Sequence, residues 1–263
     1  MKDNYYNFIL PLVRDSGGIL LEYFGTNIKT SHKGEDLRDI VTDADIKVSR
    51  FIERTIRASY PDDQIYSEER VAGTKPIDTT RAYWTIDPID GTSNFSRNIS
   101  HFAVCIGYVE SNHPSVGAIY NPITRELFSF ERGKGAFLNR AKISVLPTRT
   151  LADANVLLHI GRRPELAEWG LALQRLLLTS AKKNLNLGSS ALDICFVAAG
   201  RADASIYGTL TTRDISPALG ILREAGGEIY TAEGKPAELS DSPQKVFSCA
   251  TSELYRDIVA KSK

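Results

Sequence analysis

The sequence lacks an excess of charge of either sign, a long hydrophobic run and a leader-like N-terminus. Its 32 basic and 32 acidic side chains cancel, whereas proteins that bind nucleic acid through a basic surface carry clustered excess Lys and Arg. The clearest apolar run, 102–109, is far shorter than the roughly 20 residues of a membrane span. The first residues hold no apolar segment ending in a cleavage site. We therefore expect a cytoplasmic protein with no nucleic-acid and no membrane partner.

Cysteine is also scarce. The three cysteines, Cys105, Cys195 and Cys249, lie far apart and form no CxxC pair, which argues against a zinc ribbon or a disulfide framework. They are typical of buried thiols in a reducing compartment. The 263 residues are 42% apolar, enough to bury a sizeable core and too hydrophobic for a disordered chain.

The spacing of apolar residues predicts an N-terminal α+β half. Helical spacing appears over 5–20 and again over 42–60, with a polar loop at 25–39 between them. Short apolar segments then follow at 82–86, 102–109, 116–120 and 127–130, separated by turn residues. Such closely spaced segments indicate an antiparallel meander.

The last third alternates between strand-like and helix-like segments. Strands are predicted at 155–160, 185–187, 203–207 and 246–250, and helices at 165–178, 191–199, 215–225 and 252–261. Alternation of this kind is typical of an α/β layer. The sequence therefore predicts an α/β protein with an α+β half over 1–146 and an α/β half over 147–263.

Acidic residues gather in four short segments. These are Asp39 with Asp43 and Asp45, Glu68 with Glu69, Asp87 with Asp90, and Asp214. Three of the segments also have a structural explanation: Asp45 fits a helix capping box with Thr42, Glu68 and Glu69 fit a solvated loop, and Asp214 fits a helix N-cap. Taken singly, these residues leave both interpretations open.

The segment from Asp87 to Ser93 points to chemistry. It follows a predicted strand, Pro88 stiffens the turn, and Gly91 allows the backbone to approach a ligand closely. Thr92 and Ser93 supply hydroxyls and amides where a helix can start, which suits an anion. Two carboxylates about 4 Å apart repel by roughly 4 kcal/mol at an effective dielectric of about 20. A hard cation such as Mg²⁺ reverses that sign, so the segment predicts metal-assisted phosphoryl chemistry.

The stretch from Trp84 to Phe95 resembles the signature of the inositol monophosphatase family. That family belongs to the lithium-sensitive, magnesium-dependent phosphatases, with the fructose-1,6-bisphosphatases and 3′-phosphoadenosine phosphatases. Four further segments resemble its motifs in order, at 39–45, 67–69, 188–203 and 214–227. The resemblance implies a layered αβαβα sugar-phosphatase sandwich, often a homodimer, that hydrolyses a small phosphate ester with Mg²⁺.

The resemblance also implies roles for individual residues. The implied ligands of a first and a second magnesium ion are Glu68, Asp87, the backbone carbonyl of Ile89, Asp90 and Asp214. Glu69 would hold a water of a weaker third ion, and Asp45 with Thr92 would activate the attacking water. The implied substrate-binding residues are Asp90, Gly91, Thr92, Ser189, Ser190, Tyr207 and Asp214.

Two departures from the family leave the alcohol open. Arg213 stands where the family usually has Trp, and Tyr207 stands where inositol monophosphatases place a Glu that holds inositol hydroxyls. The surrounding run looks closer to dual inositol and fructose phosphatases of the archaeal type, while Ser189 and Ser190 weakly resemble nucleotide phosphatases. The candidate substrates are therefore inositol 1-phosphate or a related sugar or polyol phosphate, with fructose 1,6-bisphosphate and 3′-phosphoadenosine 5′-phosphate as alternatives. We expect Tyr207 at the mouth of the site.

A different class of function is also consistent with the sequence, namely a non-catalytic binding protein on the same fold. The four histidines, His32, His101, His113 and His159, form no HExxH motif and fit surface or loop positions. Among them, His159 is the candidate to face the substrate.

Overall fold

The N-terminal half combines long helices with a seven-stranded sheet in the computed structural model, which describes residues 4–26, 30–32, 40–69, 77–161 and 163–262. Its helices are α1 (Tyr5–Tyr23), α2 (Asp43–Ser59) and α3 (Thr92–Ser96). Its strands are β1 (Thr30–His32), β2 (Ile40–Thr42), β3 (Gln64–Ser67), β4 (Tyr83–Asp90), β5 (Ala103–Glu110), β6 (His113–Asn121), β7 (Glu126–Glu131), β8 (Gly135–Leu138) and β9 (Ala141–Ile143). Strands β3 to β9 cross the large sheet in chain order, while β1 and β2 pair separately.

The C-terminal half contains a five-stranded mixed sheet in the order β11-β10-β12-β14-β13. Its strands are β10 (Asn155–His159), β11 (Lys183–Leu185), β12 (Ala204–Leu210), β13 (Glu228–Thr231) and β14 (Gln244–Cys249). Its helices are α4 (Ala167–Ser180), α5 (Ser190–Ala198), α6 (Ser216–Glu224) and α7 (Ser252–Lys261), with short 3-10 turns η1 (Leu151–Asp153) and η2 (Pro164–Leu166).

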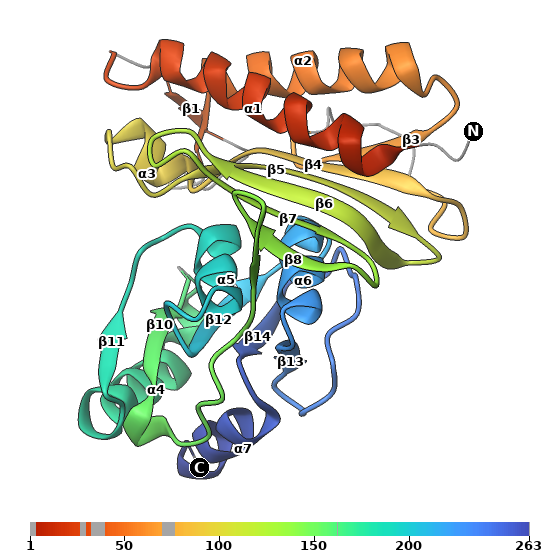
Figure 1. The fold of residues 1–263 in the computed structure, drawn as a ribbon. Coiled ribbons are helices and arrows are strands. Elements are labelled where there is room, and N and C mark those ends of the chain that lie inside the picture. Colours follow the sequence, from red (N-terminus) through yellow and green to blue (C-terminus); the bar gives the residue numbers. More distant parts are fainter. Residues whose placement is uncertain (1–3, 27–29, 33–39, 70–76, 162, 263) are drawn as a thin grey trace.

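Helices and sheets alternate in five layers (Figure 1). Helices α1 and α2 cover one face of the seven-stranded sheet, α5 and α6 lie between the two sheets, and α4 and α7 cover the outer face of the smaller sheet. Three hydrophobic clusters fill the spaces between layers. The predicted α/β class and the αβαβα sandwich are confirmed.

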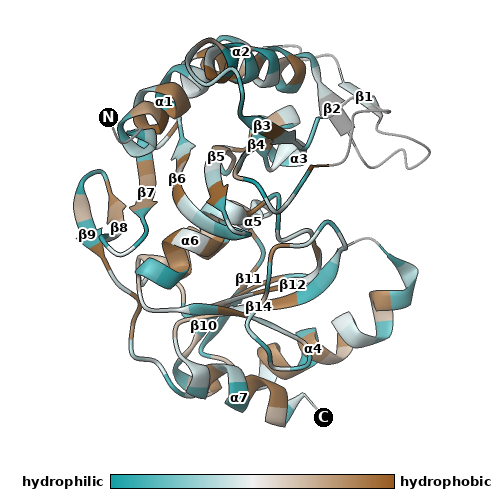
Figure 2. Ribbon diagram, turned by 90° about the vertical axis from the view of Figure 1, so that its right-hand side faces the viewer, coloured by the Kyte–Doolittle hydropathy of each residue, from teal (hydrophilic) through white to brown (hydrophobic). Residues whose placement is uncertain are grey.

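The outer helices are amphipathic. In α2, Ala44, Val48, Ile52 and Ile56 are buried at helical spacing, and α1 and α2 alternate hydrophobic and hydrophilic stretches (Figure 2). Burying one such stripe against a sheet is what stabilises a helix of this kind. Within the described residues, no helix combines the length and apolarity needed to cross a bilayer.

Several local predictions differ from the structure. Part of the predicted loop at 25–39 is strand β1, and Asp39 lies outside the described residues. The antiparallel meander predicted from 82 to 130 is confirmed, and β3, which was not predicted, pairs in parallel beside β4. Strands β1, β2, β3, β8, β9 and β13 were not predicted, and β11 ends at the residue where its predicted strand begins.

The two halves meet across a shared core. The cluster between the sheets includes Tyr83 and Phe128 from the first half and Leu157 and Ile221 from the second. The predicted boundary falls in an irregular segment after β9, and the Val145 amide in that segment donates to the Ala225 carbonyl oxygen at 3.1 Å. All three cysteines are buried and unpaired, as expected.

Candidate active site

A bulge at the end of β4 brings two aspartates onto one face of the sheet. Asp87 lies opposite Cys105 and Asp90 opposite Ala103, so three steps along β4 match two along β5. Side chains three apart on a regular strand would point to opposite faces. The extra residue therefore turns both carboxylates towards the layer between the sheets, where Ala103 and Cys105 also pack. The predicted loop after residue 86 is in fact the continuation of β4.

Gly91 follows the bulge in the left-handed region, with φ of 91°, which favours glycine. A Cβ there would lie 3.1 Å from the carbonyl oxygen of His101 and 3.3 Å from the Cβ of Ser189. The chain is thus packed closely on this side, and α3 begins at the next residue, Thr92.

Asp45 connects this segment to the start of α2. Its Oδ2 accepts from the amide and the hydroxyl of Thr42 at 2.7 and 2.6 Å, which completes the predicted capping box. Its Oδ1 lies 3.4 Å from the Oγ1 of Thr92, whose single hydroxyl proton can go either to this oxygen or to the nearer carbonyl oxygen of Ile89 at 2.9 Å. Capping and contact with Thr92 therefore use different oxygens of one carboxylate.

Glu68 and Asp214 approach from two other elements. Because β3 and β4 are parallel, Glu68 follows β3 at the same sheet edge at which β4 ends, and its amide donates to the Ile86 carbonyl oxygen at 3.0 Å. Asp214 comes from the other half, between β12 and α6. Tyr66 forms a hydrogen bond with Asp214. The Oδ1 of Asp214 is nevertheless buried and has no hydrogen-bond partner among the described residues.

Asp90 is bound to the start of α5. Its carboxylate accepts from the hydroxyl of Ser189, from the hydroxyl of Ser190 at 2.7 Å and from the amide of Ala191 at 3.0 Å. Ser189 is fully buried. The two serines predicted to bind substrate thus contact Asp90, and their contact with a substrate stays a prediction.

Burial and mutual repulsion make these carboxyl groups reluctant to ionise. Asp87 is 5% exposed, and burial followed by the charge of Glu68 holds its pKa well above the usual range. Burial also raises the pKa of Asp90, although its α5 donors oppose the shift. Burial and then Glu68 raise the pKa of Asp214 to about 7. A nearby cation would relieve this repulsion.

The acidic groups interact without forming a closed ligand set. Across the described part of the chain, no three His, Cys, Asp or Glu side chains stand together as a preassembled metal site. Nonetheless the charges of Glu68, Asp90 and Asp214 all act on Asp87. The orphaned oxygen of Asp214 and the buried carboxyls fit a hard divalent cation, which takes oxygen ligands.

Tyr207 lies inside the molecule, which corrects the expectation that it stands at the mouth of the site. Its side chain is 4% exposed and its hydroxyl donates to the Oδ2 of Asp193 at 2.5 Å. The Nε2 of His101 lies 2.9 Å from the other oxygen of Asp193. Sequence reasoning missed Asp193, because an acid in the first turn of a helix reads as a complement to the helix dipole. His159 packs against Tyr207, with ring centroids 5.6 Å apart.

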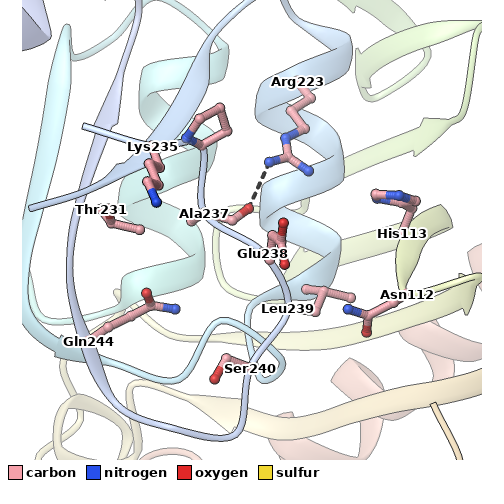
Figure 3. A pocket seen from close by; sticks show the side chains of 11 residues that line it. Asn112, His113, Arg223, Thr231, Lys235, Ala237, Glu238, Leu239, Ser240 and Gln244 are labelled. Carbon is pink, nitrogen blue, oxygen red and sulfur yellow. Dashed lines mark hydrogen bonds between the residues drawn. The ribbon is translucent and has the colours of Figure 1, made fainter. Parts of the chain in front are cut away.

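A cavity of about 910 Å³ lies elsewhere on the molecule (Figure 3). It is lined by Asn112, His113, Arg223, Thr231, Lys235, Pro236, Ala237, Glu238, Leu239, Ser240 and Gln244. None of the acidic residues above lines it. Its wall is nevertheless tied to the segment before Asp214, because the hydroxyl of Thr212 donates to the Glu238 carbonyl oxygen at 2.7 Å and accepts from the Ser240 amide at 2.9 Å.

Comparison with known proteins agrees with this geometry. The model of the inositol monophosphatase family matches residues 1–263. The chain is 34% identical over 245 residues to a protein named Nus factor SuhB from Xylella fastidiosa, covering 92% of this chain and 86% of that one. It is 31% identical over 232 residues to a fructose-1,6-bisphosphatase/inositol-1-monophosphatase from Thermotoga maritima, covering 88% and 86%.

The fold has a close counterpart among solved structures. The IMPase structure from Thermotoga maritima superposes with a TM-score of 0.87 at 28% identity, over 98% of this chain and 96% of that one. Family, fold and acidic site thus agree on hydrolysis of small phosphate esters of the sugar-phosphate type. This chain belongs to the inositol monophosphatase family and is a phosphoric monoester hydrolase.

Proposed function

We propose that this enzyme is a magnesium-dependent phosphomonoesterase that acts on inositol 1-phosphate and related sugar or polyol phosphates. The observation that carries the proposal is the convergence of Asp87, Asp90 and Asp214 from two halves of the chain, with a buried Asp214 oxygen that lacks a partner. Carboxylates arranged in this way suit Mg²⁺, which prefers oxygen ligands.

The proposed ligands are those that the resemblance to the family implies. Glu68, Asp87 and the carbonyl of Ile89 would hold a first ion, and Asp87, Asp90 and Asp214 would hold a second. Glu69 would hold a water of a third, weaker ion. When bound, Mg²⁺ supplies Lewis-acid chemistry, which offsets phosphate charge and favours attack by water.

The chain's own groups then position the ester and move a proton. The amides of Gly91 and Thr92 would bind the phosphate, as the resemblance implies. With its proton directed to Asp45 at 3.4 Å, the Thr92 hydroxyl can accept a hydrogen bond from an attacking water. Asp45, buried and fixed by Thr42, is the final proton acceptor in this relay.

The proposal for the alcohol part of the substrate rests on the absence of a carboxylate at position 207. The family resemblance implies a Glu at position 207 that holds inositol hydroxyls, but this chain has a buried Tyr207 whose hydroxyl is bonded to Asp193. The charged acceptor for inositol is therefore missing. A hydrogen bond to a charged group contributes about 1.5–3 kcal/mol, against about 0.5–1.5 kcal/mol for a neutral one. We expect inositol 1-phosphate to be accepted without being uniquely preferred. Fructose 1,6-bisphosphate is the second candidate, supported by the bifunctional relative.

A substrate panel with metal control tests this function. Inositol 1-phosphate, fructose 1,6-bisphosphate, 3′-phosphoadenosine 5′-phosphate and histidinol phosphate are assayed with Mg²⁺, with EDTA and with Li⁺. We expect turnover only with Mg²⁺, and inhibition by Li⁺. Absence of turnover on every ester would favour a non-catalytic binding protein, and a hundredfold preference for inositol 1-phosphate would contradict the argument from Tyr207.

Asp87 is the most informative single position, because it would bridge both ions. Asp87→Asn should lose more than nine-tenths of kcat, which corresponds to a barrier increase above about 1.4 kcal/mol. The measurement is kcat across an Mg²⁺ titration. A variant that keeps more than about a tenth of wild-type kcat would contradict the ligand assignment.

A homodimer and a cytoplasmic location complete the proposal. Exposed leucines on α4, Leu171 at 63% and Leu178 at 70% exposure, offer apolar surface that a second copy could cover. Sedimentation equilibrium tests the dimer directly, and a monomer at micromolar concentration would contradict it.

A further inference from the structure

Asp193 is a buried carboxylate that both halves of the molecule share. It is 1% exposed and lies in the first turn of α5. One oxygen lies 2.9 Å from the Nε2 of His101, which precedes β5 in the N-terminal half. The other accepts from Tyr207 of β12. Both oxygens of Asp193 therefore have a partner inside the protein, one from each half of the chain.

The same turn of α5 carries the donors to Asp90. Ser189 caps the helix, with its hydroxyl 3.4 Å from the Leu192 amide, and the adjacent Ser190 and Ala191 complete the set of donors to Asp90. An ionised carboxylate offers about four acceptor sites. Three donors from α5 therefore fix the orientation of Asp90 and leave little freedom for its remaining lone pairs.

His101, the partner of Asp193 in the N-terminal half, is also held by several contacts. The carbonyl oxygen of His101 accepts from the Nδ2 of Asn94 at 2.7 Å, and the same Nδ2 donates to the carbonyl oxygen of Leu187 at 2.8 Å. The His101 ring packs edge-on against Phe196 of α5, with centroids 5.3 Å apart. His101 is thus anchored to α3, which follows the bulge, and through Asn94, Asp193 and Phe196 to the segments before and after the start of α5.

We infer that Asp193, held between His101 and Tyr207, is a positioning residue that sets where the first turn of α5 meets Asp90. This inference rests on the proposed function in taking Asp90 as a ligand of the second magnesium ion. Loss of the Asp193 contacts frees the turn, misorients Asp90 and weakens magnesium binding, although none of the three residues touches the metal. Groups that orient metal ligands commonly change metal affinity by about 10–100-fold when removed.

Matched pairs of variants separate positioning from general stability. Asp193→Asn is compared with Asp203→Asn, because Asp203 is also buried and accepts from Thr148 at 2.6 Å and from the Asn155 amide at 2.7 Å. Tyr207→Phe is compared with Tyr255→Phe, whose hydroxyl donates to the Thr231 carbonyl oxygen at 3.0 Å. Each pair removes the same chemical group from a buried site.

Two readouts are measured for every variant. The first is the Mg²⁺ concentration for half-maximal activity on inositol 1-phosphate, and the second is the rise in Tm caused by Mg²⁺ alone. We expect Asp193→Asn to raise the half-saturating concentration about tenfold or more and Tyr207→Phe to raise it by less. Both should show a smaller Mg²⁺-induced rise in Tm than their matched controls, which should behave as wild type.

Failure of this inference can be told apart from failure of the proposed function. If the wild type hydrolyses none of the esters, that function fails, while the Mg²⁺-induced rise in Tm still tests Asp193. Equal Mg²⁺ responses in Asp193→Asn and Asp203→Asn, or a wild type whose Tm does not respond to Mg²⁺, would overturn the inference. If Asp193→Asn does not fold, the comparison of Tyr207→Phe with Tyr255→Phe decides between the same two results.

Discussion

At Asp45 one carboxylate contacts two elements through different oxygens, and this division can be tested. Asp45→Asn keeps an oxygen for the capping contact with Thr42 but loses the charge beside Thr92. We expect activity to fall by about 10² or more, with Tm nearly unchanged. Asp43→Asn is the matched control, because it removes a charge from the same helix turn at an exposed position. Equal activity in the two variants would mean that Asp45 only caps α2.

The raised pKa of Asp214 predicts two opposite effects of pH. The stability of the metal-free protein falls as pH rises, whereas magnesium binding strengthens. Its pKa is raised to about 7, against about 3.9 in an unfolded chain. Between those values the folded protein binds more protons than the unfolded one, so this group makes the metal-free protein less stable as pH rises. Mg²⁺ needs the ionised form, and its binding should therefore strengthen over the same range.

The measurement is Tm from pH 5.5 to 8.5, in EDTA and in saturating Mg²⁺. We expect the difference between the two curves to grow as pH rises through about 7. Asp214→Asn should flatten that growth, because the titrating carboxyl is gone. A difference in Tm that is independent of pH would show that Asp214 does not control metal binding.

Residue types and the family motifs were enough to predict which acids come near one another, but not how each is held. The bonds from Ser189 and Ser190 to Asp90 join residues 99 and 100 apart in sequence. The contact of His101 with Asp193 spans 92 residues. Such contacts depend on how the layers pack, and no local pattern in the chain records them.

At the scale of elements, the turn between β4 and α3 predicts a sharp difference between two glycines. Gly91 and Gly133 both have positive φ, but a Cβ meets close neighbours only at Gly91. Alanine in the left-handed region costs about 1–2 kcal/mol, so both Gly91→Ala and Gly133→Ala should lower the free energy of unfolding. Only Gly91→Ala should also lower kcat/KM, by about tenfold or more, because its crowding displaces the Thr92 segment.

Urea unfolding and steady-state kinetics of both variants check this expectation. Equal kcat/KM values for Gly91→Ala and Gly133→Ala would mean that the turn tolerates a side chain and that close approach is not needed there.

Element types followed from periodicity where a stripe was long and strongly apolar. The stripe of α2 is an example, with Val48, Ile52 and Ile56 fully buried. The strands that were not predicted are short: β1, β2 and β9 have three residues each, and β3, β8 and β13 have four each. Strand β9 is also largely exposed. Their pairing is determined by neighbours in the sheet and by the turns beside them, so their own residues carry little signal.

At the scale of the whole molecule, the shared core between the sheets predicts that the two halves unfold together. The sequence has only two tryptophans, Trp84 in the N-terminal half and Trp169 in the C-terminal half. In Trp84→Phe and in Trp169→Phe, fluorescence therefore reports on one half, while far-UV circular dichroism reports on both. We expect the two signals to have the same urea midpoint within each variant.

Two separate transitions in either variant would instead make 1–146 and 147–263 independently stable domains. The layered class itself was predictable, because alternation of helix and strand indicates an α/β layer. The shared core of the two halves was not predictable, because residues such as Tyr83 and Leu157 come from different sheets and are far apart in the sequence.

The extra residue in β4 makes this enzyme sensitive to chain length at one place. One residue inserted into β5 between Ala103 and Cys105 would restore even pairing with β4 and turn Asp87 and Asp90 to opposite faces of the sheet. A substitution at Val104 leaves the count intact. In a lineage of active descendants we therefore expect insertions between Ala103 and Cys105 to be eliminated far more strictly than changes of residue type. A gene carrying a one-codon insertion there would encode a protein whose two aspartates no longer share one face.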